Sequence, residues 1–293
     1  MGKSNKKPSK DINKIRPTIP KRIPHDNLSY AVLLSIDEGK STGSGFRLKI
    51  DGANYLVTAK HVLYDRHDEL YGTTLIVTCH SPSKDQTSPL IFHVDLSEAK
   101  ILRSGKFDIA AVLLGTNQPL DGHDHDTPLR QLQSDVKRPT ALIGESYVRR
   151  IQDGNGVGVS VDIEAAGMLH SISLASDVYL LGYPTSLGIR TSTFYDFSKP
   201  LIRKGIVAGV DPVRSTFVID CAAYPGNSGG PVVEHCLDGF FRVIGLVSRF
   251  IPYETKWHSN RGDVVNTDIS NSGYTVCVSM DAVVSTLKEA VAE

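Results

Sequence analysis

The amino-acid sequence predicts an all-β protein that ends in one short helix. Short runs of β-branched and aromatic residues recur along the chain, and turn residues separate them. These runs fall into two groups of roughly six, which is typical of β-barrels or β-sandwiches. Only the C-terminal segment has a clear helical periodicity, so alternating strands and helices around a parallel sheet are not expected.

The first group of predicted strands lies in the N-terminal half of the chain. Its members are Tyr30–Ile36, Gly43–Ile50, Ala53–Ala59, Thr73–Cys79, Leu90–Leu96 and Ile109–Leu114. The second group contains "VYLLGYP", "GIVAGV", "TFVIDC", "GPVVEH", "FFRVIGLVS" and "YTVCVSM". The last segment, "MDAVVSTLKEAVAE", is predicted to be an amphipathic helix because Val283, Val284, Leu287 and Val291 recur on one side.

These groups divide the chain into five parts. We expect a basic N-terminal arm over residues 1–27, a first β-barrel over 28–115, a linker with a long excursion over 116–171, a second β-barrel over 172–279 and a helix over 280–293. The arm lacks the apolar stretch of a secretory signal. Loops as long as 116–171 are usually functional or disordered, so we expect this one to act as a lid or to bind a regulatory protein.

Composition excludes several classes of function. The 32 Lys and Arg residues balance 32 Asp and Glu residues, so no overall charge attracts nucleic acid. No apolar run approaches the ~18 residues of a membrane span. The 4 cysteines are widely spaced, with no C-x-x-C pair. Without a secretory signal, they predict reduced thiols in a cytoplasmic protein that has no nucleic-acid or membrane partner.

Two loop motifs have residues typical of metal or cofactor sites but lack the necessary context. "HDHD" (His123–Asp126) contains metal-ligand types, yet adjacent residues on one loop rarely converge on a metal without further ligands. "GNGVG" (Gly154–Gly158) lacks the strand, helix and following acidic residue of a dinucleotide site. We therefore expect neither a metal nor a cofactor.

Three polar residues stand next to predicted strands, in the order His61, Asp108, Ser228. Each alone has an ordinary explanation: a structural histidine, a strand-start aspartate that caps N–H groups, and a glycine-rich turn. Together they supply a base, an orienting carboxylate and a nucleophile, and their order along the chain is that of the chymotrypsin-like class. Gly226 allows the backbone orientation that an oxyanion-binding N–H group requires.

Several motifs carry a resemblance to a known family. "GSGF", "YLVTAKHV", "FDIAAVLL", "LGYP", "KGIVAGV" and "IDCAAYPGNSGGPVV" resemble segments of chymotrypsin-fold serine peptidases, and are most similar to HtrA/Deg-like and other bacterial-type trypsin-like peptidase domains. The resemblance implies two six-stranded antiparallel Greek-key β-barrels with the site between them. It also implies that His61 is the general base, Asp108 its partner and Ser228 the nucleophile, with the N–H groups of Gly226 and Ser228 forming the oxyanion hole.

Some residues depart from the family pattern. Asn227 stands where zymogen-activated members carry aspartate, so we expect activity without N-terminal cleavage. Only a helix follows the second barrel, so we expect no PDZ domain. Ala222 occupies the position of the pocket floor, Ser248 lies in the strand that pairs with substrate, and Phe250 narrows the entrance. Together they predict a protein or peptide substrate with a small or aliphatic residue before the scissile bond.

The predicted function is therefore that of a serine endopeptidase, acting through an acyl-enzyme and activated by a partner. Two alternatives stay open. One is a catalytically silent trypsin-like fold that serves as a protein-interaction module. The presence of all three triad residue types argues against it. The other is a metal-dependent hydrolase that uses the His/Asp loop, which is less favoured because that loop lacks further ligands.

Overall fold

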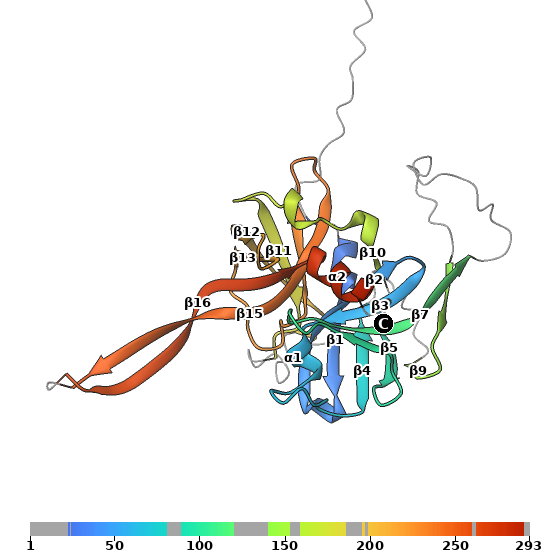
Figure 1. Cartoon of the computed structure of the whole chain (residues 1–293), viewed down its shortest axis with the longest axis horizontal. Helices are drawn as coiled ribbons and strands as arrows, with labels where there is room; N and C mark the ends of the chain where they lie inside the picture. The colour runs from blue at the N-terminus through green and yellow to red at the C-terminus, as the bar shows by residue number, and fades with distance from the viewer. Residues whose placement is uncertain are drawn as a thin grey trace, which may run out of the picture.

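The computed structural model describes residues 25–80, 89–119, 140–152, 159–185, 199–259 and 262–289, together with Ile23, Tyr195 and Asp196. These residues form two β-rich halves that lie against each other, and a helix close to the C-terminus overlies both (Figure 1). Two 3₁₀ helices, η1 (His25–Tyr30) and η2 (Asp37–Gly39), flank the first strand. Among the described residues no helix is long and apolar enough to cross a membrane.

The first half is a curled sheet of ten strands. Its sheet order is β6-β7-β3-β2-β1-β4-β5-β9, with β8 added to β7 and β10 added to β2. All the pairs are antiparallel except β10 with β2. The strands are β1 (Ala31–Ile36), β2 (Ser41–Ile50), β3 (Ala53–Thr58), β4 (Thr74–Cys79), β5 (Leu90–Asp95), β6 (Ile101–Arg103), β7 (Ala110–Pro119), β8 (Thr140–Gly144), β9 (Val148–Gln152) and β10 (Val161–Asp162).

The second half is a closed six-stranded barrel in the order β11-β12-β13-β16-β15-β14. It closes because β14 pairs with β11. In β13, Phe217 and Ile219 are buried while Val218 between them is partly exposed, as the two-residue period of a strand requires. The strands are β11 (Asp177–Gly182), β12 (Leu201–Asp211), β13 (Thr216–Asp220), β14 (Pro231–His235), β15 (Phe241–His258) and β16 (Val264–Ser279).

The two halves share buried apolar surface. Leu181 of β11 and Leu246 of β15 belong to the same buried cluster as the strands of the first half. Helix α2 (Met280–Glu289) adds to this cluster, because Val283 and Leu287 on its apolar side are buried there. The helix follows the last strand of the second half and so fastens the two halves together. The predicted all-β class, with two barrel-like halves and a C-terminal helix, is confirmed.

Part of the predicted linker belongs to the first sheet. Strand β7 continues to Pro119, β8 pairs with it, β9 pairs with β5 and β10 pairs with β2. Two short 3₁₀ helices, η4 (Ile163–Ala165) and η5 (Leu169–Ser171), then lead to the second half. The motifs "HDHD" and "GNGVG" lie outside the described residues.

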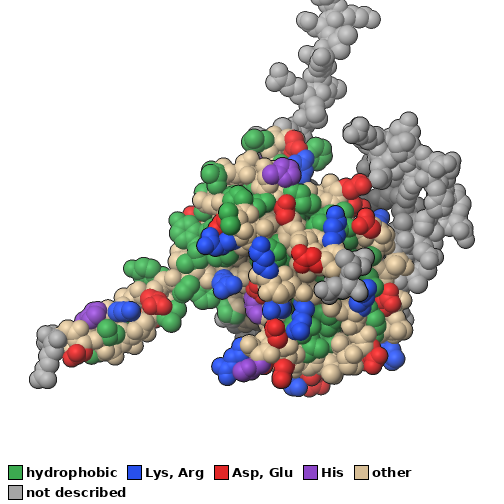
Figure 2. Space-filling model, viewed as in Figure 1, with side chains coloured by type: hydrophobic (Ala, Val, Ile, Leu, Met, Phe, Trp, Pro, Cys, Tyr) green, Lys and Arg blue, Asp and Glu red, His purple; other side chains and the backbone are tan. Residues whose placement is uncertain are grey.

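A long hairpin extends from the barrel where shorter strands were predicted. The sequence pattern ends one strand at Ser248 and begins the next at Tyr274, whereas β15 and β16 run on as a two-stranded arm (Figure 1). Figure 2 shows the arm standing clear of the body, with apolar, polar and charged side chains mixed along it. Tyr253, Trp257 and Ile269 are all exposed. Over residues 251–258, β-branched and aromatic residues stand at every second position, as in a strand, but the predicted strand ended at Ser248.

Candidate active site

The sheet order brings His61 and Asp108 together although 47 residues separate them. His61 lies on α1 (Lys60–Leu63), a single helical turn that follows β3. Asp108 lies in the loop between β6 and β7. Strands β3 and β7 are hydrogen-bonded neighbours, and Thr58 at the end of β3 pairs with Ala110 at the start of β7. The two functional side chains therefore leave adjacent strands at the same edge of the sheet.

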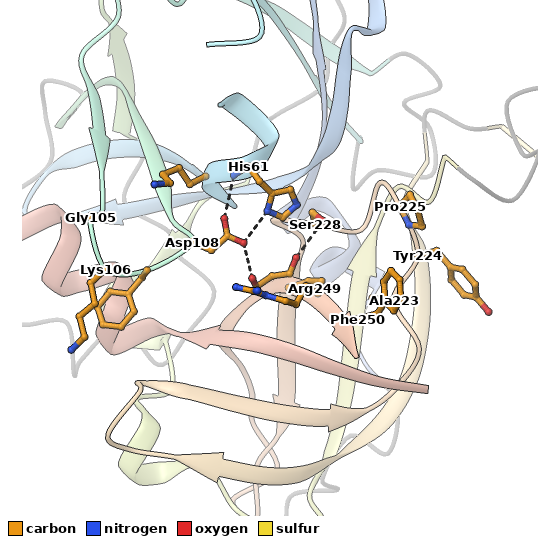
Figure 3. Close-up of a pocket in the computed structure, with 14 residues that line it drawn as sticks. His61, Gly105, Lys106, Asp108, Ala223, Tyr224, Pro225, Ser228, Arg249 and Phe250 are labelled. Carbon is orange, nitrogen blue, oxygen red and sulfur yellow. Dashed lines mark hydrogen bonds and ion pairs between the residues drawn. The ribbon is translucent and has the colours of Figure 1, made fainter. Parts of the chain in front are cut away.

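Asp108 accepts three hydrogen bonds. Its Oδ2 lies 2.9 Å from Nδ1 of His61, and its Oδ1 accepts the His61 backbone N–H at 3.2 Å. The Ser248 hydroxyl donates to Oδ2 at 2.6 Å (Figure 3). Burial acts to raise the pKa of Asp108, but the hydrogen bonds from His61 and Ser248 outweigh it, so the pKa lies below its usual range. Asp108 is therefore ionised at neutral pH.

This geometry orients the imidazole of His61. A carboxylate only accepts hydrogen bonds, so the 2.9 Å contact puts the proton of a neutral His61 on Nδ1. The other nitrogen, Nε2, is then left as a base. The histidine side chain is 49% exposed, so Nε2 is accessible from the solvent side. His61 is thus arranged to accept a proton at Nε2 from a group in the cleft.

Ser228 comes from the other half of the molecule, in the loop between β13 and β14. It lines the same cleft as His61 and Asp108. Its hydroxyl donates to the backbone carbonyl of Ser248 at 3.4 Å. Among the hydrogen bonds of the described residues, none joins Ser228 to His61. Such bonds are often long in sites without substrate, and a rotation of the hydroxyl away from the carbonyl would free it for His61.

Ser248 has a role that the sequence did not indicate. It was predicted to bind substrate, and it does line the cleft. In addition, its hydroxyl donates to Asp108 and its carbonyl accepts from Ser228. Because 140 residues separate Ser248 from Asp108, no local motif could have revealed this contact.

The loop that carries Ser228 has a shape that only glycine permits at Gly226. This residue has φ +96°, and a Cβ there would lie 2.3 Å from the carbonyl oxygen of Tyr183. Among the described residues, no backbone acceptor is hydrogen-bonded to the N–H of either Gly226 or Ser228. Donors of an oxyanion hole must likewise be free of other acceptors.

Asn227 forms two hydrogen bonds with Tyr224 inside the same loop. Its backbone N–H donates to the Tyr224 carbonyl at 2.9 Å, and its side-chain Oδ1 accepts the Tyr224 N–H at 2.9 Å. Asn227 is buried, with 1% of its surface exposed. The buried Asn227 is thus hydrogen-bonded within the loop through neutral groups, and neither bond involves a charged residue.

Ser44 of β2 connects the first half to this loop. Its hydroxyl donates to the Gly226 carbonyl at 2.7 Å and accepts the Tyr183 N–H at 2.9 Å. Its backbone N–H donates to the Ser228 carbonyl at 2.8 Å. Ser44 is fully buried, so each of these bonds is shielded from water. The residue holds the Gly226 and Ser228 carbonyls toward the first half.

The cleft between the halves has a volume of about 690 Å³. Of the residues predicted to bind substrate, Ser248 and Phe250 line it, but Ala222 does not. Its neighbour Ala223 does. The lining residues are Lys60, His61, Gly105, Lys106, Phe107, Asp108, Ala223, Tyr224, Pro225, Ser228, Val247, Ser248, Arg249 and Phe250.

Comparison with known families agrees with this arrangement. The family model of the trypsin-like peptidase domain matches residues 43–246, well over half of the chain. The chain therefore belongs to the trypsin-like peptidase family.

The chain was also compared with individual solved structures and curated proteins. A serine endoprotease from Yersinia pestis is similar in structure, with 13% sequence identity and a TM-score of 0.48. The match covers 92% of this chain and 66% of that one, which is just under two thirds of its length. No curated protein matches the sequence.

Replacement of Ser44 by alanine should destabilise the protein and its nucleophile loop. The substitution leaves the buried Tyr183 N–H and Gly226 carbonyl without their partner, which should lower the free energy of unfolding by about 1–3 kcal/mol. Urea denaturation measures this change. Ser285→Ala, on the exposed side of α2, is the matched control and should change stability by less than about 0.5 kcal/mol. Equal effects of the two substitutions would contradict the role of Ser44 as a link between the halves.

Protonation of Asp108 should reduce stability at acid pH. Because its pKa is lower in the folded protein than the ordinary value of 3.8, its contribution is fully present above 3.8 and is lost as the pH falls through the folded value. Asp108→Asn should remove this part of the pH dependence, so its free energy of unfolding should fall less steeply than that of wild type between about pH 5 and pH 2. Asp51→Asn, at an exposed turn, should follow wild type. Parallel curves for wild type and Asp108→Asn would refute the assignment.

Proposed function

We propose that this chain is a serine endopeptidase in which His61, Asp108 and Ser228 form the catalytic triad. The observation that carries the proposal is the convergence of these three side chains in one cleft, with His61 oriented by an ionised Asp108. In the glycine loop, the N–H groups of Gly226 and Ser228 have no hydrogen-bonded backbone acceptor among the described residues. Base, orienting carboxylate, nucleophile and oxyanion donors are the complete set that attack on an amide carbonyl requires.

The proposed reaction proceeds in two stages. First, the Ser228 oxygen attacks the carbonyl carbon of the substrate while Nε2 of His61 takes the hydroxyl proton. The negative charge that develops on the carbonyl oxygen is stabilised by the N–H groups of Gly226 and Ser228, and the charge on His61 by Asp108. The C–N bond then breaks as His61 returns the proton to the leaving amine. Water attacks the resulting ester in the same way and regenerates Ser228.

A probe that reacts with activated serines tests the proposal directly. A fluorophosphonate should label the wild-type protein at Ser228, and Ser228→Ala should abolish labelling. Ser285→Ala, which removes a hydroxyl of α2 outside the lining of the cleft, should preserve labelling. Wild-type protein that folds but is not labelled would favour the alternative of a catalytically silent interaction module. Hydrolysis that a chelator stops would instead favour a metal-dependent enzyme.

We also propose that activity needs no N-terminal cleavage. The buried amide of Asn227 already bonds to Tyr224, so the loop has no carboxylate that would await a new N-terminal amine. The full-length chain should therefore react with the fluorophosphonate as rapidly as a chain lacking residues 1–22. Labelling that appears only after this segment is removed would disprove the proposal.

The residue before the scissile bond is proposed to be small or aliphatic. Ala223, Val247 and Phe250 give the cleft an apolar part, and no carboxylate lies among them to bind a basic side chain. In a peptide series, Ala or Val at this position should give a higher kcat/KM than Arg or Lys. The reverse order would contradict this specificity.

Control by a partner protein stays a prediction. It concerns the segment 116–171, of which residues 120–139 and 153–158 lie outside the described residues.

A further inference from the structure

The cleft carries more positive charge than the protein as a whole. The sequence has 32 basic and 32 acidic residues. In contrast, the cleft is lined by Lys60, Lys106 and Arg249, and Asp108 contributes the one carboxylate of its lining. The positive charge is therefore concentrated where a substrate would bind.

Two of these three cations have no acidic partner among the described residues. Lys60 forms an ion pair with Asp68 at 3.1 Å, which offsets its charge. Lys106 lies over the ring of Phe107, with its Nζ 5.0 Å from the ring centroid. Arg249 is exposed. In the part of the chain that the structure describes, no carboxylate lies within ion-pair distance of Lys106 or Arg249.

The carboxylate that lines the cleft cannot balance these charges. Asp108 already accepts from the His61 ring and backbone and from the Ser248 hydroxyl. Its side chain is only 17% exposed and lies behind these donors. Within the described part of the chain, no anion is therefore left to neutralise Lys106 and Arg249, and an anionic substrate group could do so.

The two cations come from opposite halves and lie close to the triad along the chain. Lys106 is two residues before Asp108, and Arg249 directly follows Ser248, whose carbonyl accepts from Ser228. Figure 3 shows Lys106 on the side of Asp108 away from Ala223 and Pro225. The apolar part of the cleft, proposed to hold the residue before the scissile bond, thus lies on one side, and Lys106 lies on the other.

This separation indicates which part of a substrate would meet the cations. The pairing of β15 with β14 ends at Leu246, and Arg249 lies beyond that point. A peptide in extended conformation advances about 3.3 Å per residue, so residues further from the scissile bond would pass Arg249 there. Long Lys and Arg side chains reach a carboxylate at any of several successive positions. The relevant positions are the second to fourth residues on the N-terminal side of the cleaved bond.

We propose that Lys106 and Arg249 select peptides with an acidic residue two to four positions before the scissile bond. The proposal rests on the proposed peptidase function and specifies its substrate class. The two cations draw acidic segments into the cleft by electrostatic attraction, which raises the rate of productive encounter. The apolar pocket separately accommodates the side chain next to the cleaved bond.

Matched peptides test this selection. Each pair contains Glu or the isosteric Gln at the second, third or fourth position, with Ala next to the scissile bond throughout. At one or more positions the wild type should show a kcat/KM roughly 2- to 30-fold higher for the Glu peptide, as expected for two exposed ion pairs. The preference should shrink as salt is raised from about 0.01 M to 1 M, because screening shortens the electrostatic range.

Charge variants identify the residues responsible. The double variant Lys106→Gln/Arg249→Gln should no longer distinguish Glu from Gln, and Lys106→Glu/Arg249→Glu should favour Lys over Glu at the same position. Lys256→Gln, which removes an exposed cation of the hairpin arm, should keep the wild-type preference. A wild type indifferent to Glu and Gln at all three positions would overturn the proposal. So would a preference that survives in the double variant.

A binding measurement separates failure of this inference from failure of the proposed function. Fluorescently labelled Glu and Gln peptides are titrated against Ser228→Ala, and fluorescence anisotropy gives their Kd values. If wild type is neither labelled by the fluorophosphonate nor hydrolytic, the peptidase proposal fails, while tighter binding of the Glu peptide still supports the cation site. If labelling succeeds and both peptides bind equally, the cation site alone is refuted. Circular dichroism confirms that each variant is folded.

Discussion

The carboxylate of Asp108 is the interaction on which the site depends. A buried negative charge is costly unless hydrogen bonds or opposite charges compensate it. Here the compensation comes from both halves: His61 lies on the first, and Ser248 lies on the second. The two contacts with His61 lie within the first half and orient the imidazole there. Packing of the second half adds the Ser248 hydroxyl as a third donor to the same carboxylate.

Ser44 also connects the two halves. Asp108 of the first half accepts a hydrogen bond from Ser248 of the second, and Ser44 of the first half is hydrogen-bonded to the loop of the second half that carries Ser228. The Ser44 backbone lies so close to this loop that a residue with a Cβ does not fit at one of its positions. A Cβ on Gly229, which has φ +81°, would lie 2.2 Å from the Ser44 carbonyl oxygen. The glycines around Ser228 are therefore required both for the turn and for contact with the opposite half.

Sequence patterns predicted the parts of the fold that have one buried face. Strand β13 alternates buried Phe217 and Ile219 with more exposed residues, and such strands were recognised. The hairpin arm was missed although residues 251–258 alternate as a strand does. Both faces of the arm meet solvent, and cross-strand pairing holds it together. Strands β8 to β10 were also missed, since they are only two to five residues long and lie within a turn-rich, largely polar stretch. The sequence pointed to Ala222 from its spacing before Ser228, whereas in the structure the next residue, Ala223, lines the cleft.

By itself, the sequence determined the all-β class, the order of His61, Asp108 and Ser228, and the glycine turn. These features follow from local chemistry: strand periodicity, residue type and the conformations that glycine allows. Only the tertiary structure decided that Ser248 completes the environment of Asp108, that Ser44 holds the nucleophile loop, and that Lys106 and Arg249 meet in one cleft. Each of these contacts joins segments far apart in the chain. Their geometry is set by how two sheets pack, which no local pattern encodes.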